Sequence, residues 1–234
     1  MSYAESPYGN LAALARADER TDFIVRTYLH LAGAVALFVA LEAVLLNVSG
    51  VENLVGLMIG NRLSWLVVLG LFMLVSFVAD RWARSATSVP IQYLGLTLYV
   101  VAEAVIFVPI LFIAQRIDPQ IITSAALATL GLFGLLTVTV FVTRKDFSFL
   151  RGILVFGGLA AIALIVLAIF FHFALGPIFT YAMIALACGY ILYDTSNVLH
   201  HYRIGQHVAA ALALFAAVAL LFWYLVQLYM SRRD

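Results

Sequence analysis

Charged side chains are scarce in this 234-residue chain: Asp, Glu, Lys and Arg make up 11% of it, whereas 65% is hydrophobic. Soluble globular domains average about 25% charged and about 45–50% apolar residues, so the composition excludes an ordinary soluble domain. The formal net charge is only +1, which gives no electrostatic basis for binding nucleic acid. The single cysteine, Cys188, excludes an internal disulfide bond and is expected to pack as a small apolar side chain.

Signatures of catalysis and of metal binding are also missing. The chain has no HExxH zinc motif, no GxSxG nucleophile elbow and no Walker loop. Three histidines, His200, His201 and His207, are close in sequence, but no i, i+4 pair, cysteine or carboxylate supports them as metal ligands, so a solvated loop is the preferred interpretation. We therefore expect no catalytic residue, no cofactor and no bound metal, and a protein that is not an enzyme.

Long apolar segments fill most of the chain. Blocks of roughly 20 to 26 residues can cross a hydrocarbon core of about 30 Å, and they must be helical because lipid cannot hydrogen-bond a free backbone. The sequence thus predicts an all-α, polytopic membrane protein with a polar cytoplasmic tail (1–22), a seven-helix domain (23–230) and a short C-terminal tail (231–234). The expected membrane segments are 23–47, 62–80, 89–114, 120–142, 150–173, 176–199 and 207–230.

The basic residues favour one orientation in the membrane, because cytoplasmic loops carry an excess of Lys and Arg. On the side of the N-terminus lie nine of them: Arg16, Arg20, Arg26, Arg81, Arg84, Arg144, Lys145, Arg151 and Arg203. On the other side lie four: Arg62, Arg116, Arg232 and Arg233. We therefore expect a multi-pass protein of a bacterial plasma (inner) membrane with its N-terminus in the cytoplasm. The lipid bilayer is then its first partner.

Four ionisable side chains lie within the predicted segments: His30, Glu42, Glu103 and Asp194. Each costs about 2.5–3.5 kcal/mol at the bilayer centre on insertion scales, so such residues mark functional sites by default. Glu42 is expected near the outer boundary, either as an interfacial side chain that reaches water or as a functional group. Glu103 falls near the middle of the membrane, where a purely structural role is less expected.

Asp194 is the most informative of these residues. Helical spacing places Tyr190, Asp194, Asn197 and His201 on one face of the sixth segment. Such a polar stripe faces the bundle interior or a water-filled cavity, where an isolated carboxylate takes up a proton and a nearby cation keeps it charged. The alternative is a structural hydrogen bond that holds helices together. The candidate charge partners at that depth are Arg26, Arg81, Arg84 and His30.

Several stretches together resemble the Bax inhibitor-1 (transmembrane Bax inhibitor motif) family, and within it the bacterial YccA-like branch. They are "FIVRTYLHLAGAVAL", Glu103, "FVTRKDFSFLRGIL" and "GYILYDTSNVLHH", in that order across seven segments. The resemblance implies a bundle in which the last helix is central, and a pH-sensitive calcium leak. It also implies an aspartate pair on the sixth and seventh helices. Asp194 matches the first aspartate, but Ala217 occupies the position of the second and Leu220 that of the following asparagine.

Two functional hypotheses follow. The first is a pH-sensitive leak pathway for cations, calcium especially, in which Asp194, Glu103, Tyr190, Asn197 and His30 line the path or sense pH. Calcium prefers about six to eight oxygen ligands, so one aspartate and one glutamate favour leak over tight binding. The second is a regulator without transport activity that binds an FtsH-type membrane protease, as the YccA-like resemblance implies, through the polar tail at residues 1–22.

Overall fold

The computed structural model describes residues 11–85 and 88–232, and every regular element in these ranges is a helix. Seven of the helices are long and apolar enough to cross a membrane, which confirms the predicted all-α polytopic class. The two others, η1 and α2, are short. The elements are η1 (Ala12–Leu14), α1 (Ala17–Leu45), α2 (Val51–Ile59), α3 (Arg62–Ala83), α4 (Val89–Ile117), α5 (Gln120–Thr143), α6 (Leu150–Phe171), α7 (Gly176–His200) and α8 (His207–Met230).

The spanning helices agree closely with the predicted segments, with one marked difference at the start of α1. This helix begins at Ala17, six residues before the first apolar segment. Asp18 and Glu19 occupy its first turn, where negative side chains favour helix formation through the helix dipole. Hydropathy therefore marks where a helix becomes apolar, whereas charge and capping mark where it begins.

Helix starts elsewhere follow local chemistry. Asn61 caps α3, since its side chain accepts a hydrogen bond of 2.8 Å from the backbone N–H of Ser64. Pro90 and Pro177 lie in the first turns of α4 and α7, where a missing N–H costs the helix no hydrogen bond. The short helix α2, which hydropathy alone did not predict, is joined to the end of α4 by an ion pair between Glu52 and Arg116.

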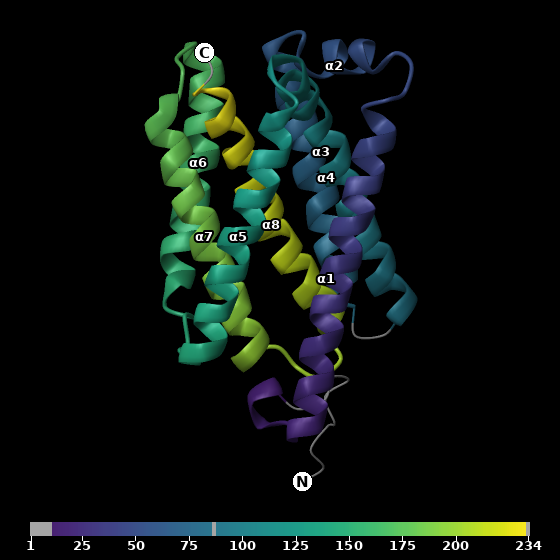
Figure 1. Ribbon diagram of the computed structural model, residues 1–234, viewed down its shortest axis with the longest axis vertical. Helices are drawn as coiled ribbons and strands as arrows, with labels where there is room; N and C mark the ends of the chain where they lie inside the picture. The colour runs from purple at the N-terminus through teal and green to yellow at the C-terminus, as the bar shows by residue number, and fades with distance from the viewer. Residues whose placement is uncertain (1–10, 86–87, 233–234) are drawn as a thin grey trace.

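Helix α8 is the centre of the bundle and the most deeply buried of the spanning helices, as the sequence predicted. It packs against α1, α3 and α4 on one side and against α5 and α7 on the other, while α6 packs mainly on α7. Figure 1 shows α8 (yellow) crossing between these two groups of helices. Helix α1 begins at one end of the bundle, here called the N-terminal end, and α8 finishes at the opposite, C-terminal end, where α2 also lies.

The segment before α1 is attached to the bundle. Leu11 forms an isolated β-bridge with Arg203. The N–H of Ala12 donates to the carbonyl of Tyr202 at 2.8 Å, and Ala12 is fully buried. The part of the predicted tail that the structure describes is therefore folded against the connection between α7 and α8; residues 1–10 lie outside the described ranges.

The closest helix pair is α3 and α4. Ala79 and Ala83 on α3 are buried where Gly95 of α4 faces them. A Cβ atom built on Gly95 would lie 2.6 Å from the backbone oxygen of Ala79 and 2.5 Å from the backbone nitrogen of Ala83. Such contacts between small residues stabilise helix pairs in lipid, because backbones approach closely and dispersion replaces the hydrophobic effect.

Gly95→Ala is therefore expected to lower the free energy of unfolding by about 1–3 kcal/mol, the usual range for overpacking a rigid contact. Thermal unfolding of the purified protein in detergent measures the change. Gly131→Ala on α5 is the matched control, because a Cβ there meets no atom within 4 Å and removes only backbone freedom. Equal stability of the two variants would contradict the close α3–α4 contact.

Candidate functional site

A cavity of about 1340 Å³ lies between the two groups of helices, lined by α3, α4, α6, α7 and α8. Its lining includes Arg62 and Arg84, the residues at the two ends of α3. At about 1.5 Å per residue these lie about 33 Å apart, close to the thickness of a bilayer core. The cavity therefore runs along the whole membrane-spanning length of α3.

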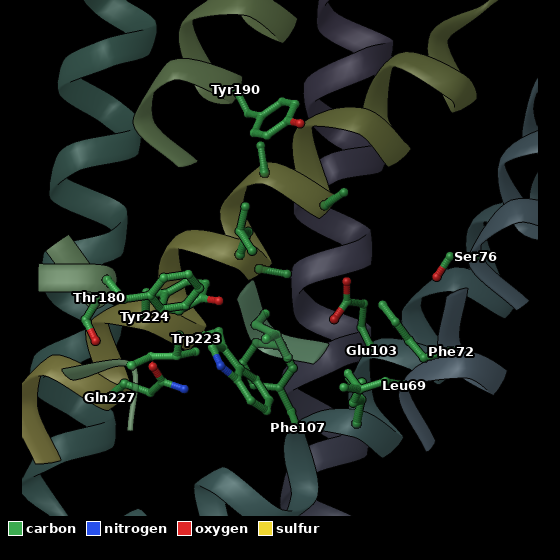
Figure 2. A pocket seen from close by; sticks show the side chains of 18 of the residues that line it. Leu69, Phe72, Ser76, Glu103, Phe107, Thr180, Tyr190, Trp223, Tyr224 and Gln227 are labelled. Carbon is green, nitrogen blue, oxygen red and sulfur yellow. The ribbon is translucent and has the colours of Figure 1, made fainter. Parts of the chain in front are cut away.

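Glu103 supplies a carboxyl group in the middle of this cavity. The residue is only 6% exposed, and Tyr99, one turn earlier on α4, forms a hydrogen bond with its side chain. Figure 2 shows Glu103 facing the same space as Trp223 and Phe107, with Phe72 beside it. Aromatic rings thus lie on several sides of this carboxyl group.

Asp194 lies at the N-terminal end of the cavity, 9% exposed. It interacts electrostatically with Arg84 and forms a hydrogen bond with the side chain of Asn197. Arg84 in turn bonds both carboxylate oxygens of Asp80 through its Nε atom, at 2.9 Å each. Arg84 thus pairs directly with Asp80 at the end of α3 and attracts Asp194 of α7 electrostatically.

Tyr202, just after α7, completes this cluster. Its side chain forms a hydrogen bond with Arg84, and burial, more than the neighbouring Asp194, raises the pKa of its phenol. Burial lowers the pKa of the Arg84 guanidinium, but the bonds to Asp80 and Tyr202 more than offset that effect and the net pKa is raised. Arg84 therefore stays a cation, and its positive charge attracts Asp194.

The structure brings together some of the predicted site residues. Asp194, Glu103, Tyr190 and Arg84 all line the cavity, and Asn197 bonds Asp194. The Tyr190 hydroxyl donates to the backbone oxygen of Leu154 on α6 at 2.9 Å.

The other candidates lie outside the cavity. Arg26 pairs with Asp22 at 2.9 Å, and Arg81 lies over the ring of Phe77 at 5.5 Å. His30 contacts the Tyr93 hydroxyl at 2.9 Å. Of the four candidate charge partners, Arg84 is the one that meets Asp194 across the cavity.

Two members of the cluster, Asp80 and Tyr202, were not among the predicted residues. A sequence signal for Asp80 does exist, because "DRWAR" places an acid four residues before Arg84 at the end of an apolar segment, the spacing of a helical ion pair. Tyr202 carries no such signal, since its position depends on how the chain turns after α7.

The seventh spanning helix offers no carboxyl group to the cavity. Ala213, Ala216, Ala217 and Leu220 of α8 line it instead. Ala217, at the position where the family resemblance implies an aspartate, therefore faces the same cavity as Asp194. The negative charges of the cavity come from the surrounding helices α3, α4 and α7.

A second polar contact holds the α5–α6 connection on the end of α7. The N–H of Phe147 donates to the Ser196 hydroxyl at 2.9 Å, and His201 contacts the Asp146 carboxylate at 3.0 Å. His201 therefore belongs to this contact, although it shares a predicted helix face with Asp194. The histidines point to separate partners, since His207 packs on the ring of His30 at 4.9 Å. Within 11–85 and 88–232, no group of three or more His, Cys, Asp or Glu could hold a metal ion.

Comparison with known proteins finds relatives across several kingdoms. The protein-family model described as "Inhibitor of apoptosis-promoting Bax1" matches residues 20–234. Protein LIFEGUARD 4 of Arabidopsis thaliana is 32% identical over 60% of the chain and 58% of the relative. Bax inhibitor 1 of Schizosaccharomyces pombe is 31% identical over 70% of the chain and 61% of the relative. An uncharacterized protein of Pseudomonas aeruginosa is 27% identical over 68% of the chain and 69% of the relative. The chain thus spans about three fifths of the length of the first two.

The Asp146 contact gives a prediction about pH. The backbone N–H of Ser148 and, to a smaller extent, His201 hold the pKa of Asp146 below its usual value, which is about 3.9. The charged carboxylate therefore stabilises the α5–α6 connection at neutral pH, and this contribution is lost as the pH falls through the lowered pKa. We expect Asp146→Asn to speed hydrogen exchange in residues 144–149 a few-fold at neutral pH, measured by mass spectrometry.

Asp118→Asn is the matched control, because Asp118 makes the same type of bond, to the N–H of Gln120 at 2.7 Å, in the α4–α5 connection. It should leave residues 144–149 unchanged. Unaltered exchange in the Asp146 variant would show that its carboxylate does not hold the connection.

Proposed function

The chain belongs to the Bax inhibitor-1 family, and on that premise we propose that it is a pH-sensitive leak pathway for cations, calcium especially, across a bacterial plasma membrane. The observation that carries this proposal is the cavity that follows α3 from Arg62 to Arg84 and ends at Asp194. In the proposed orientation the N-terminus and the Asp80–Arg84–Asp194 cluster lie on the cytoplasmic side. Glu103 then lies between the outer opening and the cluster.

The gating step is electrostatic. While Asp194 is charged, its attraction to Arg84 holds the C-terminal ends of α3 and α7 together at the N-terminal end of the bundle. A proton on Asp194 removes that attraction and leaves Arg84 bound to Asp80, so the two helix ends are free to separate. Mild acidification on the cytoplasmic side therefore opens the pathway, and the carboxyl group of Glu103 attracts the cation through the aromatic part of the cavity.

The few carboxyl groups in the cavity favour passage of calcium over tight binding of the ion. Calcium prefers about six to eight oxygen ligands, several of them carboxylates. Glu103 and Asp194 lie on different helices and at different depths, and Ala217 adds no third carboxylate. A cation would meet these groups one after another and leave again.

Asp194→Asn mimics the protonated state and should raise calcium flux into liposomes at neutral pH to the level that wild-type protein reaches at mildly acidic pH. The expected rise is about tenfold, which corresponds to about 1.4 kcal/mol in the gating equilibrium. The variant should also lose its pH dependence. Asp22→Asn is the control, because Asp22 is an exposed carboxylate that pairs with Arg26 away from the cavity.

Arg84→Gln should raise the calcium flux in the same way. The double variant should show little more flux than either single variant, because both substitutions remove the same attraction between Asp194 and Arg84. Flux that is indistinguishable from empty liposomes, from protein shown to be folded, would rule out the leak pathway. Flux that keeps its pH dependence in Asp194→Asn would reject Asp194 as the sensor.

A second candidate function is regulation of an FtsH-type membrane protease without transport. The observation in its favour is Ala217, because a cavity face without the second carboxylate lacks the implied aspartate pair. A protease of that kind needs a flexible segment to grip. Since Leu11 and Ala12 are held on the α7–α8 connection, the segment proposed as this handle is the part before Leu11.

Deletion of residues 2–10 should then abolish co-purification with the protease while thermal stability stays unchanged. Replacement of the same residues by a Gly/Ser segment of equal length is the control, and it separates the need for length from the need for sequence. Undiminished association after the deletion would contradict this second candidate.

A further inference from the structure

Glu42 is a carboxyl group outside the cavity, in the last turn of α1. The residue is only 5% exposed. Both of its carboxyl oxygens are buried and have no hydrogen-bond partner among the described residues. The alternative that Glu42 reaches water at the membrane boundary is therefore wrong. A buried polar side chain without a partner is rare in folded proteins and requires an explanation.

Helix geometry shows where the side chain lies. The buried residues of α1 form one stripe, with Leu31, Ala34, Phe38 and Glu42 at spacings of three or four residues. Phe38, one turn before Glu42, packs edge-on against Phe107 of α4 at 5.1 Å and against α8 through Phe215 at 6.0 Å and Phe222 at 6.5 Å. Glu42 therefore continues the stripe into the seam between α1, α4 and α8, on the C-terminal side of a cluster of phenylalanines.

The ionisable groups on the elements packed against α1 have other positions or partners. On α4, Glu103 and Tyr99 line the cavity, Tyr93 contacts His30 and Arg116 pairs with Glu52 of α2. On α8, Tyr224 lines the cavity and His207 packs on His30, while Tyr229 lies near the end of the helix. The packed element η1 contributes only Ala12–Leu14. No hydrogen bond or ion pair joins Glu42 to any of these groups.

The surroundings decide the charge of the group. An ionised carboxylate without a cation or hydrogen-bond donor is very unfavourable in an apolar site, whereas the neutral acid is tolerated. We infer that Glu42 is a proton-binding site in the α1–α4–α8 seam, separate from the cavity, which holds its proton as long as α1 stays packed.

Release of this proton requires that water reach the seam. Deprotonation and the opening of α1 from α4 and α8 are therefore coupled: each favours the other. Alkaline conditions loosen the C-terminal half of α1, and neutral or acidic conditions keep it packed. The opening proposed at Asp194 occurs at acidic pH, whereas this loosening occurs at alkaline pH. It depends on the contacts of α1 with α4 and with α8.

Dicyclohexylcarbodiimide tests the protonation state, because this apolar reagent reacts with neutral carboxylic acids in membrane interiors. The acid O–H adds across one C=N bond, and the adduct rearranges to an N-acylurea that keeps every atom of both reactants. We expect label at Glu42 in the purified wild-type protein at neutral pH, located by mass spectrometry, and a decline of at least tenfold at alkaline pH. Glu42→Gln should lose this label. Asp194→Asn and Glu19→Gln, whose altered side chains lie outside the seam, should keep it.

Infrared spectroscopy covers the case in which tight packing excludes the reagent. A carbonyl band of a protonated carboxylic acid should be present at neutral pH in the Glu103→Gln/Asp194→Asn protein and absent once Glu42→Gln is added. Glu42→Met, with a side chain of similar length, serves if the glutamine variant does not fold. A band that persists in the triple variant, with no label at Glu42, would overturn the inference.

Hydrogen exchange tests the coupling. Residues 35–45 should exchange several-fold faster at alkaline than at neutral pH in wild type, after correction for the intrinsic rate, and this excess should vanish in Glu42→Gln. An equal pH response of both proteins would overturn the coupling. None of these measurements uses ion flux, so failure of the leak pathway and failure of this inference give separate results.

Discussion

The interaction between Asp194 and Arg84 joins two groups of helices that also meet at the central helix, in the α4–α5 contact and through Tyr28 of α1, which packs on Phe133 and Phe141 of α5. Because α8 has no Asp, Glu, Lys or Arg, no carboxylate, ammonium or guanidinium of the central helix holds the groups together. The contact across the cavity depends on one carboxylate from α7 and one guanidinium from α3. Asp80 and Tyr202 stabilise the position of that guanidinium. A proton on Asp194 would remove the attraction to Arg84 and so weaken the connection between the two groups of helices across the cavity.

Ala217 changes what a proton can do in this cavity. A pair of carboxylates shares one proton because two negative charges in contact repel each other, and such a pair titrates in two coupled steps. With alanine on α8, Asp194 faces a cation instead of a second acid. Protonation then breaks an attraction, whereas in a pair it relieves a repulsion. A sensor of this form has a single step, and its response depends on how strongly Arg84 is held by Asp80.

Much of the fold could be predicted from the sequence, because lipid imposes strict rules on backbone and charge. The seven apolar segments and the proline positions at the starts of α4 and α7 agree with the structure, and so does the central last helix, which the family resemblance implied. The start of α1 at Ala17 and the short helix α2 did not follow from hydropathy, since α1 begins with acidic residues in its first turn and α2 is joined to α4 by an ion pair. For the site, helix periodicity placed Tyr190 and Asp194 on one face. It could not show which of four basic residues lies opposite, because that choice depends on the packing of α3 against α4.

Glu42 and Asp194 illustrate why an intramembrane carboxyl group must be judged from its neighbours. Both are at most 9% exposed, and both interrupt apolar helices. Arg84 and Asn197 favour the charged form of Asp194, whereas the buried carboxyl group of Glu42 has no hydrogen-bond partner among the described residues, which favours the neutral acid. The two groups also lie on different faces of the bundle, one in the cavity and one in the seam of α1. A drop in pH therefore removes a charge at Asp194, where a charge is needed for contact, but leaves Glu42 as it was. In the proposed scheme a rise in pH removes the proton of Glu42, so the packed state would have a different limit on the acidic and on the alkaline side.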